Sequence, residues 1–189
     1  MVIFGRNLKH IVAATLLAGA FSASVMAQET DSTDPAELLE RLAQAEPADA
    51  GRIDRQLRAL WSKSGSASMD LLLKRGRDAM EVGDLEAALE HFTALTDHAP
   101  EFAEGWAERA AAYYAADLYG PAVADLERAL ALNPHNYNTI FGLGVILETF
   151  GDKARAYEAF RRVEAIHPNH ENVAPALERL RPHVEGTSL

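Results

Sequence analysis

The hydrophobic positions of this chain recur at a fixed interval of 34 residues through its central part. Within each copy they are spaced three or four residues apart in two blocks, which predicts two amphipathic helices packed on each other. Five rows keep their size and polarity from copy to copy: Leu72, Trp106 and Ile140; Gly76, Ala110 and Gly144; Ala88, Ala122 and Ala156; Phe92, Leu126 and Phe160; and Leu95, Ala129 and Val163. Pro100, Pro134 and Pro168 close the copies, because proline cannot continue a helix.

These rows define three repeats, over residues 69–102, 103–136 and 137–170. In the first and third, Gly83 with Asp84 and Gly151 with Asp152 mark the turn between the two helices. Glycine reaches the left-handed conformation at a helix end, and aspartate caps the helix that follows.

The turn of the second repeat has a different sequence. Here Gly120 is expected to end the first helix and Pro121 to open the second, because proline fits a first helical turn. The same two-helix unit is therefore predicted in all three copies.

The spacing of these residues resembles that of a known family. The second copy reads Trp106-x-x-Arg109-Ala110-x-x-Tyr113, then Ala122-x-x-x-Leu126, then Pro134. In this order of aromatic, small and closing proline residues the chain resembles the tetratricopeptide repeat family. The resemblance implies an all-α fold, an α-α superhelix or solenoid with three full repeats. Arg75 and Arg109 stand where the family has leucine, and we expect looser helix contacts there.

The ends of the repeats need a cover, because a terminal repeat leaves an apolar face in water. Within the C-terminal segment 171–189, residues 172–184 have apolar side chains at helical spacing and predict a capping helix. On the N-terminal side, 35–46 and 52–63 are amphipathic, and a linker rich in serine and glycine follows. Residues 35–68 are therefore either a degenerate fourth repeat or a capping helical hairpin, and the sequence leaves both open.

The first 27 residues have the three parts of a secretory signal peptide. Arg6 and Lys9 precede an apolar run over 11–21, and small residues end the segment at Ala27. The run is shorter than the ~20 residues that span a bilayer, so a membrane anchor is the lesser alternative. We expect cleavage after Ala27 and a bacterial, periplasmic location. Residues 28–34 are polar and are expected to form a flexible segment.

Composition narrows the possible functions. The net charge of −10, from 28 acidic and 18 basic residues, argues against a nucleic-acid binder, which needs a basic face. The chain has no cysteine, which excludes disulfides, thiol catalysis and cysteine-ligated metals. We expect no integral membrane segment after the signal peptide is removed.

The resemblance also implies a binding groove. In the family, ligand contacts usually come from four positions of the first helix of each repeat, and their spacing places them on one helix face. Tyr114 and Met80 are the strongest candidates, although any floor residue has the alternative of packing inside the repeats. The predicted groove residues are Leu73, Arg77, Met80, Glu104, Ala107, Ala111, Tyr114, Asn138, Phe141, Val145 and Glu148, with Asp70 at the remaining position.

One use of the family's groove is a clamp for a peptide's C-terminal carboxylate. Its positions here read Leu73, Arg77, Glu108, Asn138 and Gly142. Only two of these residues could serve, and the carboxylate of Glu108 would repel the ligand. We therefore expect an apolar or amphipathic partner segment, held by a few side chains.

Candidate chemistry is sparse in this sequence. It contains no glycine-rich phosphate loop and no motif of a metalloprotease or serine hydrolase. His167 and His170 are close enough in sequence for a metal ion, but Glu171 is the one carboxylate beside them. We expect no catalytic residue, no metal site and no cofactor.

Together these observations predict a non-catalytic scaffold or chaperone of the bacterial periplasm. It would bind a peptide or helix of a partner protein in its concave groove, and the partner's identity stays open. Two alternatives are an assembly factor for c-type cytochromes, which the resemblance suggests, and a self-associating structural envelope protein. In the latter, a homo-oligomer would pair through the hairpin at 35–63.

Overall fold

The computed structural model describes residues 34–186, and this part of the chain is all-α, with nine helices and no strand. The signal segment at 1–27 and most of the polar segment that follows lie outside the described residues. Within 34–186, none of the helices combines the length and the apolar character that crossing a bilayer requires.

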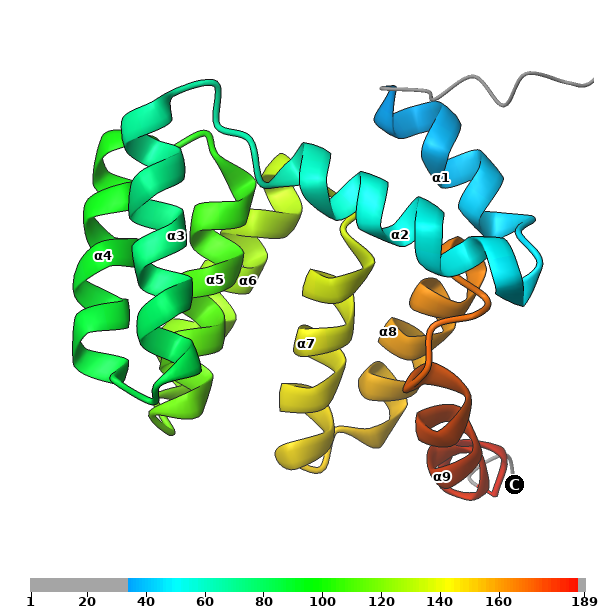
Figure 1. Ribbon diagram of the computed structural model, residues 1–189. Coiled ribbons are helices and arrows are strands. Elements are labelled where there is room, and N and C mark those ends of the chain that lie inside the picture. Colours follow the sequence, from blue (N-terminus) through cyan, green and yellow to red (C-terminus); the bar gives the residue numbers. More distant parts are fainter. Residues whose placement is uncertain (1–33, 187–189) are drawn as a thin grey trace, which may run out of the picture. The chain divides into compact units, whose positions relative to one another are not determined.

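Six helices form three consecutive antiparallel pairs (Figure 1). The second helices of the pairs begin 34 residues apart and end 34 residues apart, as the sequence period predicts. This confirms the solenoid of three helix pairs. The pairs are α3 (Ala67–Glu81) with α4 (Leu85–His98), α5 (Ala103–Ala115) with α6 (Tyr119–Leu132), and α7 (Tyr137–Thr149) with α8 (Lys153–Ile166).

Close contact inside a pair depends on the row of small residues. A Cβ atom added to Gly76 would lie 2.3 Å from Cε1 of Phe92, and one added to Gly144 would lie 2.6 Å from Cε1 of Phe160. Both phenylalanine rings are fully buried. Glycine therefore lets each ring lie directly on the backbone of the facing helix.

The turns of the first and third pairs have the predicted structure. Gly83 and Gly151 have φ values of +75° and +78°, in the left-handed region that glycine tolerates. The carboxylates of Asp84 and Asp152 each accept a hydrogen bond of 3.1 Å from the backbone N–H three residues later. The two residues thus end one helix and cap the next.

The predicted turn of the second pair is wrong. Gly120 and Pro121 lie in the first turn of α6, where proline has no intrahelical hydrogen bond to lose. The chain reverses at Asp117 instead, with φ +59°, and this residue is 34 positions from each turn glycine. Aspartate is among the few residues that adopt the left-handed conformation with little strain.

The helix contacts around Arg109 are not loose, in contrast to the prediction. Arg109 lies between three helices, with its Nε and Nη2 2.7 and 2.9 Å from the carboxylate of Asp125 and its Nη1 2.8 Å from Oγ1 of Thr96. The guanidinium lies 4.8 Å from the ring centroid of Trp106, and the hydrogen bond to Asp125 raises its pKa. A paired cation thus fills the space of the family's leucine, whereas Arg75 is exposed.

The N-terminal segment forms a helical hairpin, one of the two arrangements left open by the sequence. It consists of α1 (Pro35–Ala43) and α2 (Pro47–Trp61). The hairpin does not continue the stack beyond α3, since α1 packs on α8 and α2 crosses above α7 toward the first pair (Figure 1). Its buried residues, which share a core with the third repeat and α9, are Leu38, Leu42, Ala50, Ile53 and Leu57.

The C-terminal helix α9 (Val173–Glu185) covers the last pair, as predicted. Its apolar face is buried against α8 and consists of Val173, Ala176, Leu177 and Leu180. The third repeat is therefore covered from both sides, by α9 and by the N-terminal hairpin.

Candidate functional site

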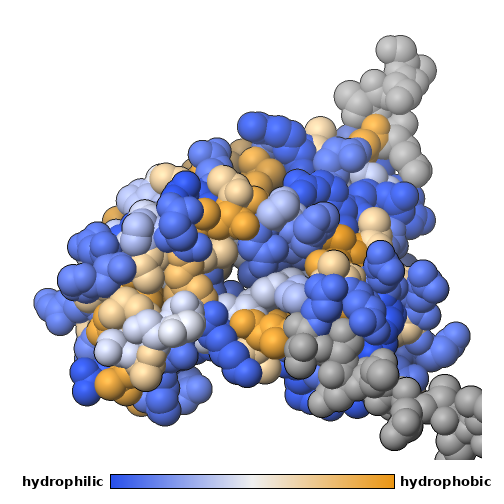
Figure 2. All heavy atoms as spheres, turned by 90° about the horizontal axis from the view of Figure 1, so that it is seen from above, coloured by the Kyte–Doolittle hydropathy of each residue, from blue (hydrophilic) through white to orange (hydrophobic). Residues whose placement is uncertain are grey.

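A groove of about 920 Å³ lies between the inner faces of α3, α5 and α7, and α2 borders it. In the view from above, the surface is hollowed at its centre, and hydrophobic and weakly polar residues adjoin the hollow (Figure 2). The groove is therefore formed by the first helix of each repeat, together with one helix from outside the repeats.

Most of the residues predicted for the groove line it. They are Arg77, Glu104, Ala107, Ala111, Tyr114, Asn138, Phe141 and Val145. Contact of these residues with a partner stays a prediction, since geometry alone shows only that they border the same cavity.

Four predicted residues do not line the groove, and one of them is Asp70, whose Oδ1 accepts hydrogen bonds from the N–H and the hydroxyl of Ser64. Leu73 is 2% exposed and lies in the core between α3 and α4, and Met80 packs against the same core. Glu148 accepts hydrogen bonds of 2.7 and 2.8 Å from Nε and Nη2 of Arg179 on α9. The capping helix thus occupies Glu148, and the helix face of the first repeat is turned further into its own core than the family spacing implied.

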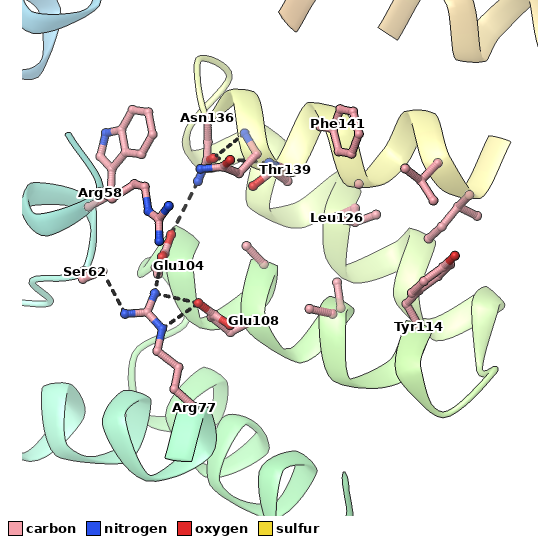
Figure 3. Close-up of a pocket in the computed structure, with 18 of the residues that line it drawn as sticks. Arg58, Ser62, Arg77, Glu104, Glu108, Tyr114, Leu126, Asn136, Thr139 and Phe141 are labelled. Atoms are coloured by element: carbon pink, nitrogen blue, oxygen red, sulfur yellow. Dashed lines mark hydrogen bonds and ion pairs between the residues drawn. The ribbon is translucent and has the colours of Figure 1, made fainter. Parts of the chain in front are cut away.

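One end of the groove is polar, and Arg77 is at its centre (Figure 3). Its guanidinium donates to Glu104, to Oε1 of Glu108 at 2.7 Å and to Oγ of Ser62 at 3.0 Å. Asn136 donates to the other oxygen of Glu104 at 3.4 Å. The carboxylate of Glu108, which would repel a bound carboxylate, is thus held by Arg77, and Arg77 itself is not free to act as a clamp.

The surroundings of Glu104 disfavour its charged form. Burial of the side chain and the neighbouring carboxylate of Glu108 raise its pKa, while Arg77 lowers it. Two carboxylates therefore share one guanidinium, an arrangement that fixes the geometry of the groove wall at this end.

The other end of the groove is apolar. Ala111 and Gly142 form a low floor, and Tyr114, Phe141 and Val145 rise around it. Figure 3 shows Tyr114 and Phe141 directed into this end, away from the ion pairs. Small floor residues allow the backbone of a bound segment to approach closely, and the aromatic rings offer apolar contact.

A cluster of buried and half-buried rings supports this apolar end from behind. His170 lies 4.9 Å from Phe141, and His167 lies 5.1 Å from Tyr137, measured between ring centroids. Nδ1 of His167 is buried and has no hydrogen-bond partner among residues 34–186. No group of three metal-ligating side chains occurs within the described residues.

The cluster predicts that stability falls in mild acid. Burial lowers the pKa of both His167 and His170. Below about pH 6.5 the unfolded imidazoles bind protons while the folded ones stay neutral, so the free energy of unfolding decreases as the pH drops toward the folded pKa values. We expect a slope of up to about 1.4 kcal/mol per pH unit for each histidine, measured by urea unfolding between about pH 7.5 and 5.5.

A double variant, His167→Phe with His170→Phe, isolates this contribution. It should lose most of the slope, whereas His135→Gln, at an exposed histidine, should keep it. A slope that is the same in both variants would show that other groups cause the acid sensitivity.

The α2 side of the groove was missed by the sequence prediction. Arg55, Arg58, Trp61 and Ser62 line the cavity from this helix. Local periodicity identifies α2 as a helix but carries no information on where it folds back. The spacing of its arginines was the one visible signal of a second polar face.

Comparison with known proteins agrees with the repeat fold. The sequence matches the tetratricopeptide repeat family over residues 73–137 and 118–171. A TPR repeat-containing protein of Rhizobium etli is 27% identical over 149 residues, which cover 76% of this chain and 73% of that protein. Human Superkiller complex protein 3 is 30% identical over 109 residues, or 57% of this chain, but the chain spans only 6% of its length.

Two solved structures share the fold. One is the first TPR domain of Spaghetti (RPAP3) bound to the HSP90 peptide SRMEEVD, with a TM-score of 0.59, 21% identity and coverage of 61% of this chain and 91% of that one. The other is the Yersinia enterocolitica type III secretion chaperone SycD in complex with a peptide of the translocator YopD, with a TM-score of 0.58, 17% identity and coverage of 62% and 95%. At these identities the likeness shows the fold alone. With the family match over more than half its length, the chain belongs to the tetratricopeptide repeat family.

Proposed function

We propose that this protein is a non-catalytic interaction module that binds a peptide or helix of a partner protein in the groove between α2, α3, α5 and α7. The observation that carries the proposal is the groove itself, which joins a floor of small residues to an apolar end and a polar end within one cavity. Such a surface can hold an extended or helical segment through backbone approach and a few side-chain contacts.

Two neighbours in fold support this reading. The RPAP3 domain holds an HSP90 peptide, and the SycD chaperone holds a peptide of the translocator YopD. Since fold alone does not fix function, the argument for this chain rests on its own groove residues.

The setting we propose is the bacterial periplasm, where the protein would act as a scaffold or chaperone. The support is the charged, apolar and small-residue pattern of residues 1–27. Mass spectrometry of the periplasmic fraction should find a mature N-terminus at Gln28. Recovery of the uncleaved chain from the cytoplasm would contradict the proposed location.

Filling the groove floor tests the proposed function. Ala111 is exposed on the floor, so Ala111→Trp should fill the cavity and leave the core intact. Phe141 is a poorer choice, because its ring packs 5.1 Å from that of Phe160 in the core. We expect crosslinking pull-down from a periplasmic extract to lose at least about tenfold of the specific partner, the effect of removing roughly 1.4 kcal/mol of binding free energy.

Ala124→Trp is the matched control, since Ala124 is exposed on α6 and does not line the groove. It should capture the partner as the wild type does. Equal capture by both variants would move the binding site elsewhere, and capture of only the protein itself would favour the self-associating role. Circular dichroism of each variant confirms that the helices are retained.

A further inference from the structure

The arginines of α2 give the groove a property that the repeats alone do not supply. Resting on the proposed function, we infer that the groove recognises a segment with a carboxylate at one end and apolar side chains at the other. Arg55 and Arg58 of α2 receive the carboxylate, and the surface around Tyr114 receives the apolar side chains. Helix α2, which lies outside the repeats, is then a specificity element as well as part of the hairpin that covers the third repeat.

The positive charge available to a ligand is on α2. Of the three arginines that line the groove, Arg77 is already paired with two carboxylates. Within residues 34–186, Arg58 is 63% exposed and forms an ion pair with Asp54 at 3.7 Å. Arg55 is exposed and makes no hydrogen bond or ion pair within residues 34–186.

Asp54, the ion-pair partner of Arg58, also connects α2 to the third repeat. Its Oδ1 accepts a hydrogen bond of 2.6 Å from the hydroxyl of Tyr137. That bond, together with burial, raises the pKa of Tyr137, so the phenol remains a proton donor to Asp54. Three arginines (Arg55, Arg58 and Arg77) and two carboxylates (Glu104 and Glu108) line the groove, so its lining has one more positive than negative charge.

Charge complementarity favours an acidic segment at this end. The chain as a whole carries a net charge of −10, so its remaining surface repels acidic partners. Arg55 and Arg58 therefore orient an approaching carboxylate toward the α2 end of the groove. Guanidinium groups also match carboxylates in geometry, since they can donate two parallel hydrogen bonds.

The opposite end of the groove favours apolar side chains and continues beyond the cavity. The ring of Tyr114 lies 5.7 Å from that of Tyr119, which lies 5.2 Å from that of Phe150. Phe150 is 65% exposed and Leu118 is 46% exposed. The apolar surface therefore runs from the groove floor over the turns of the second and third repeats.

The α2 arginines are well placed for selective binding because the helix is held in position. Ile53 and Leu57 are at most 3% exposed in the shared core, and Nδ2 of Asn169 donates to the carbonyl oxygen of Ala45 at 2.8 Å. Arginines on a rigid element lose little freedom of the backbone when a ligand binds.

Selection from a displayed library of random peptides tests the inference on the whole chain from Gln28 onward. Peptides selected by the wild type should be enriched in aspartate or glutamate together with aromatic or aliphatic residues. Arg55→Glu reverses the charge of a side chain that makes no hydrogen bond or ion pair within residues 34–186, so it should select peptides with lysine or arginine in place of the acidic residue. The apolar residues should be selected as before.

The matched control is Arg75→Glu, at an exposed arginine of α3 that does not line the groove. It should select the same acidic peptides as the wild type. The affinity of the selected peptide, measured by fluorescence polarisation, should fall about tenfold for Arg55→Glu at low salt and much less at high salt, because salt screens a rim charge.

The outcomes separate this inference from the proposed function. Apolar peptides without acidic enrichment, or acidic enrichment that survives Arg55→Glu, would overturn the role of α2 and leave the groove as a peptide site. Failure of the wild type to select any peptide, or selection that Ala111→Trp does not abolish, would overturn the proposed function as well.

Discussion

Replacing Asp125 by alanine is expected to destabilise the protein by about 3–5 kcal/mol, because the guanidinium of Arg109 would lose the carboxylate with which it is paired at a largely buried site. The side chains of Arg109 and Asp125 are 13% and 8% exposed, so water can replace only a small part of the lost interaction. Urea unfolding followed by circular dichroism would measure the change.

Two further variants distinguish the loss of the Arg109–Asp125 ion pair from a general effect of removing a charged side chain. Arg109→Leu with Asp125→Leu removes both charges and restores the family's apolar residue, so it should recover most of the lost stability. Glu101→Ala breaks the exposed pair with Arg128, in which the side chains are 78% and 40% exposed, and should cost at most about 1 kcal/mol. A cost for Asp125→Ala as small as that for Glu101→Ala would show that the Arg109 charge is solvated.

The fold was largely predictable because large and small side chains recur at equivalent positions of each repeat. In the first and third repeats, a glycine of the first helix (Gly76 or Gly144) faces a phenylalanine of the second (Phe92 or Phe160). The same pair of residues therefore produces the same helix contact in both repeats. The prediction failed where local turn residues were given more weight than the period. Asp117 lies at the period position of the turn glycines, and its left-handed conformation follows from the repeat rather than from its residue type.

The groove was predictable only where it is made of repeats. Positions on one face of α5 and α7 line it because each of these helices is flanked by other repeats. Glu148 does not line the groove because its carboxylate binds Arg179, a residue 31 positions further along the chain. The arginines of α2 were missed for the same reason, since neither the fold-back of a hairpin nor the docking of a capping helix is encoded in local spacing.

Gly76→Ala is expected to destabilise the protein, although helix propensity alone predicts the opposite. Alanine is favoured over glycine inside a helix by about 1 kcal/mol, so Gly76→Ala would be stabilising at an open position. Here the added Cβ would lie 2.3 Å from a buried ring atom of Phe92. Overpacking of this kind costs roughly 1–3 kcal/mol, so after the gain in helix propensity we expect a net loss of up to about 2 kcal/mol in the free energy of unfolding.

Gly142→Ala provides the matched control, because its Cβ would meet only Cδ2 of Leu126 at an ordinary 3.7 Å. It should stabilise the protein by about 0.5–1 kcal/mol, the opposite sign from Gly76→Ala. The second repeat shows how alanine is accommodated, since Ala110 packs there with Leu126 in place of a phenylalanine. Gly76→Ala combined with Phe92→Leu should therefore cost less than the sum of the two single changes, and strict additivity would mean that the ring is not what excludes a side chain at this position.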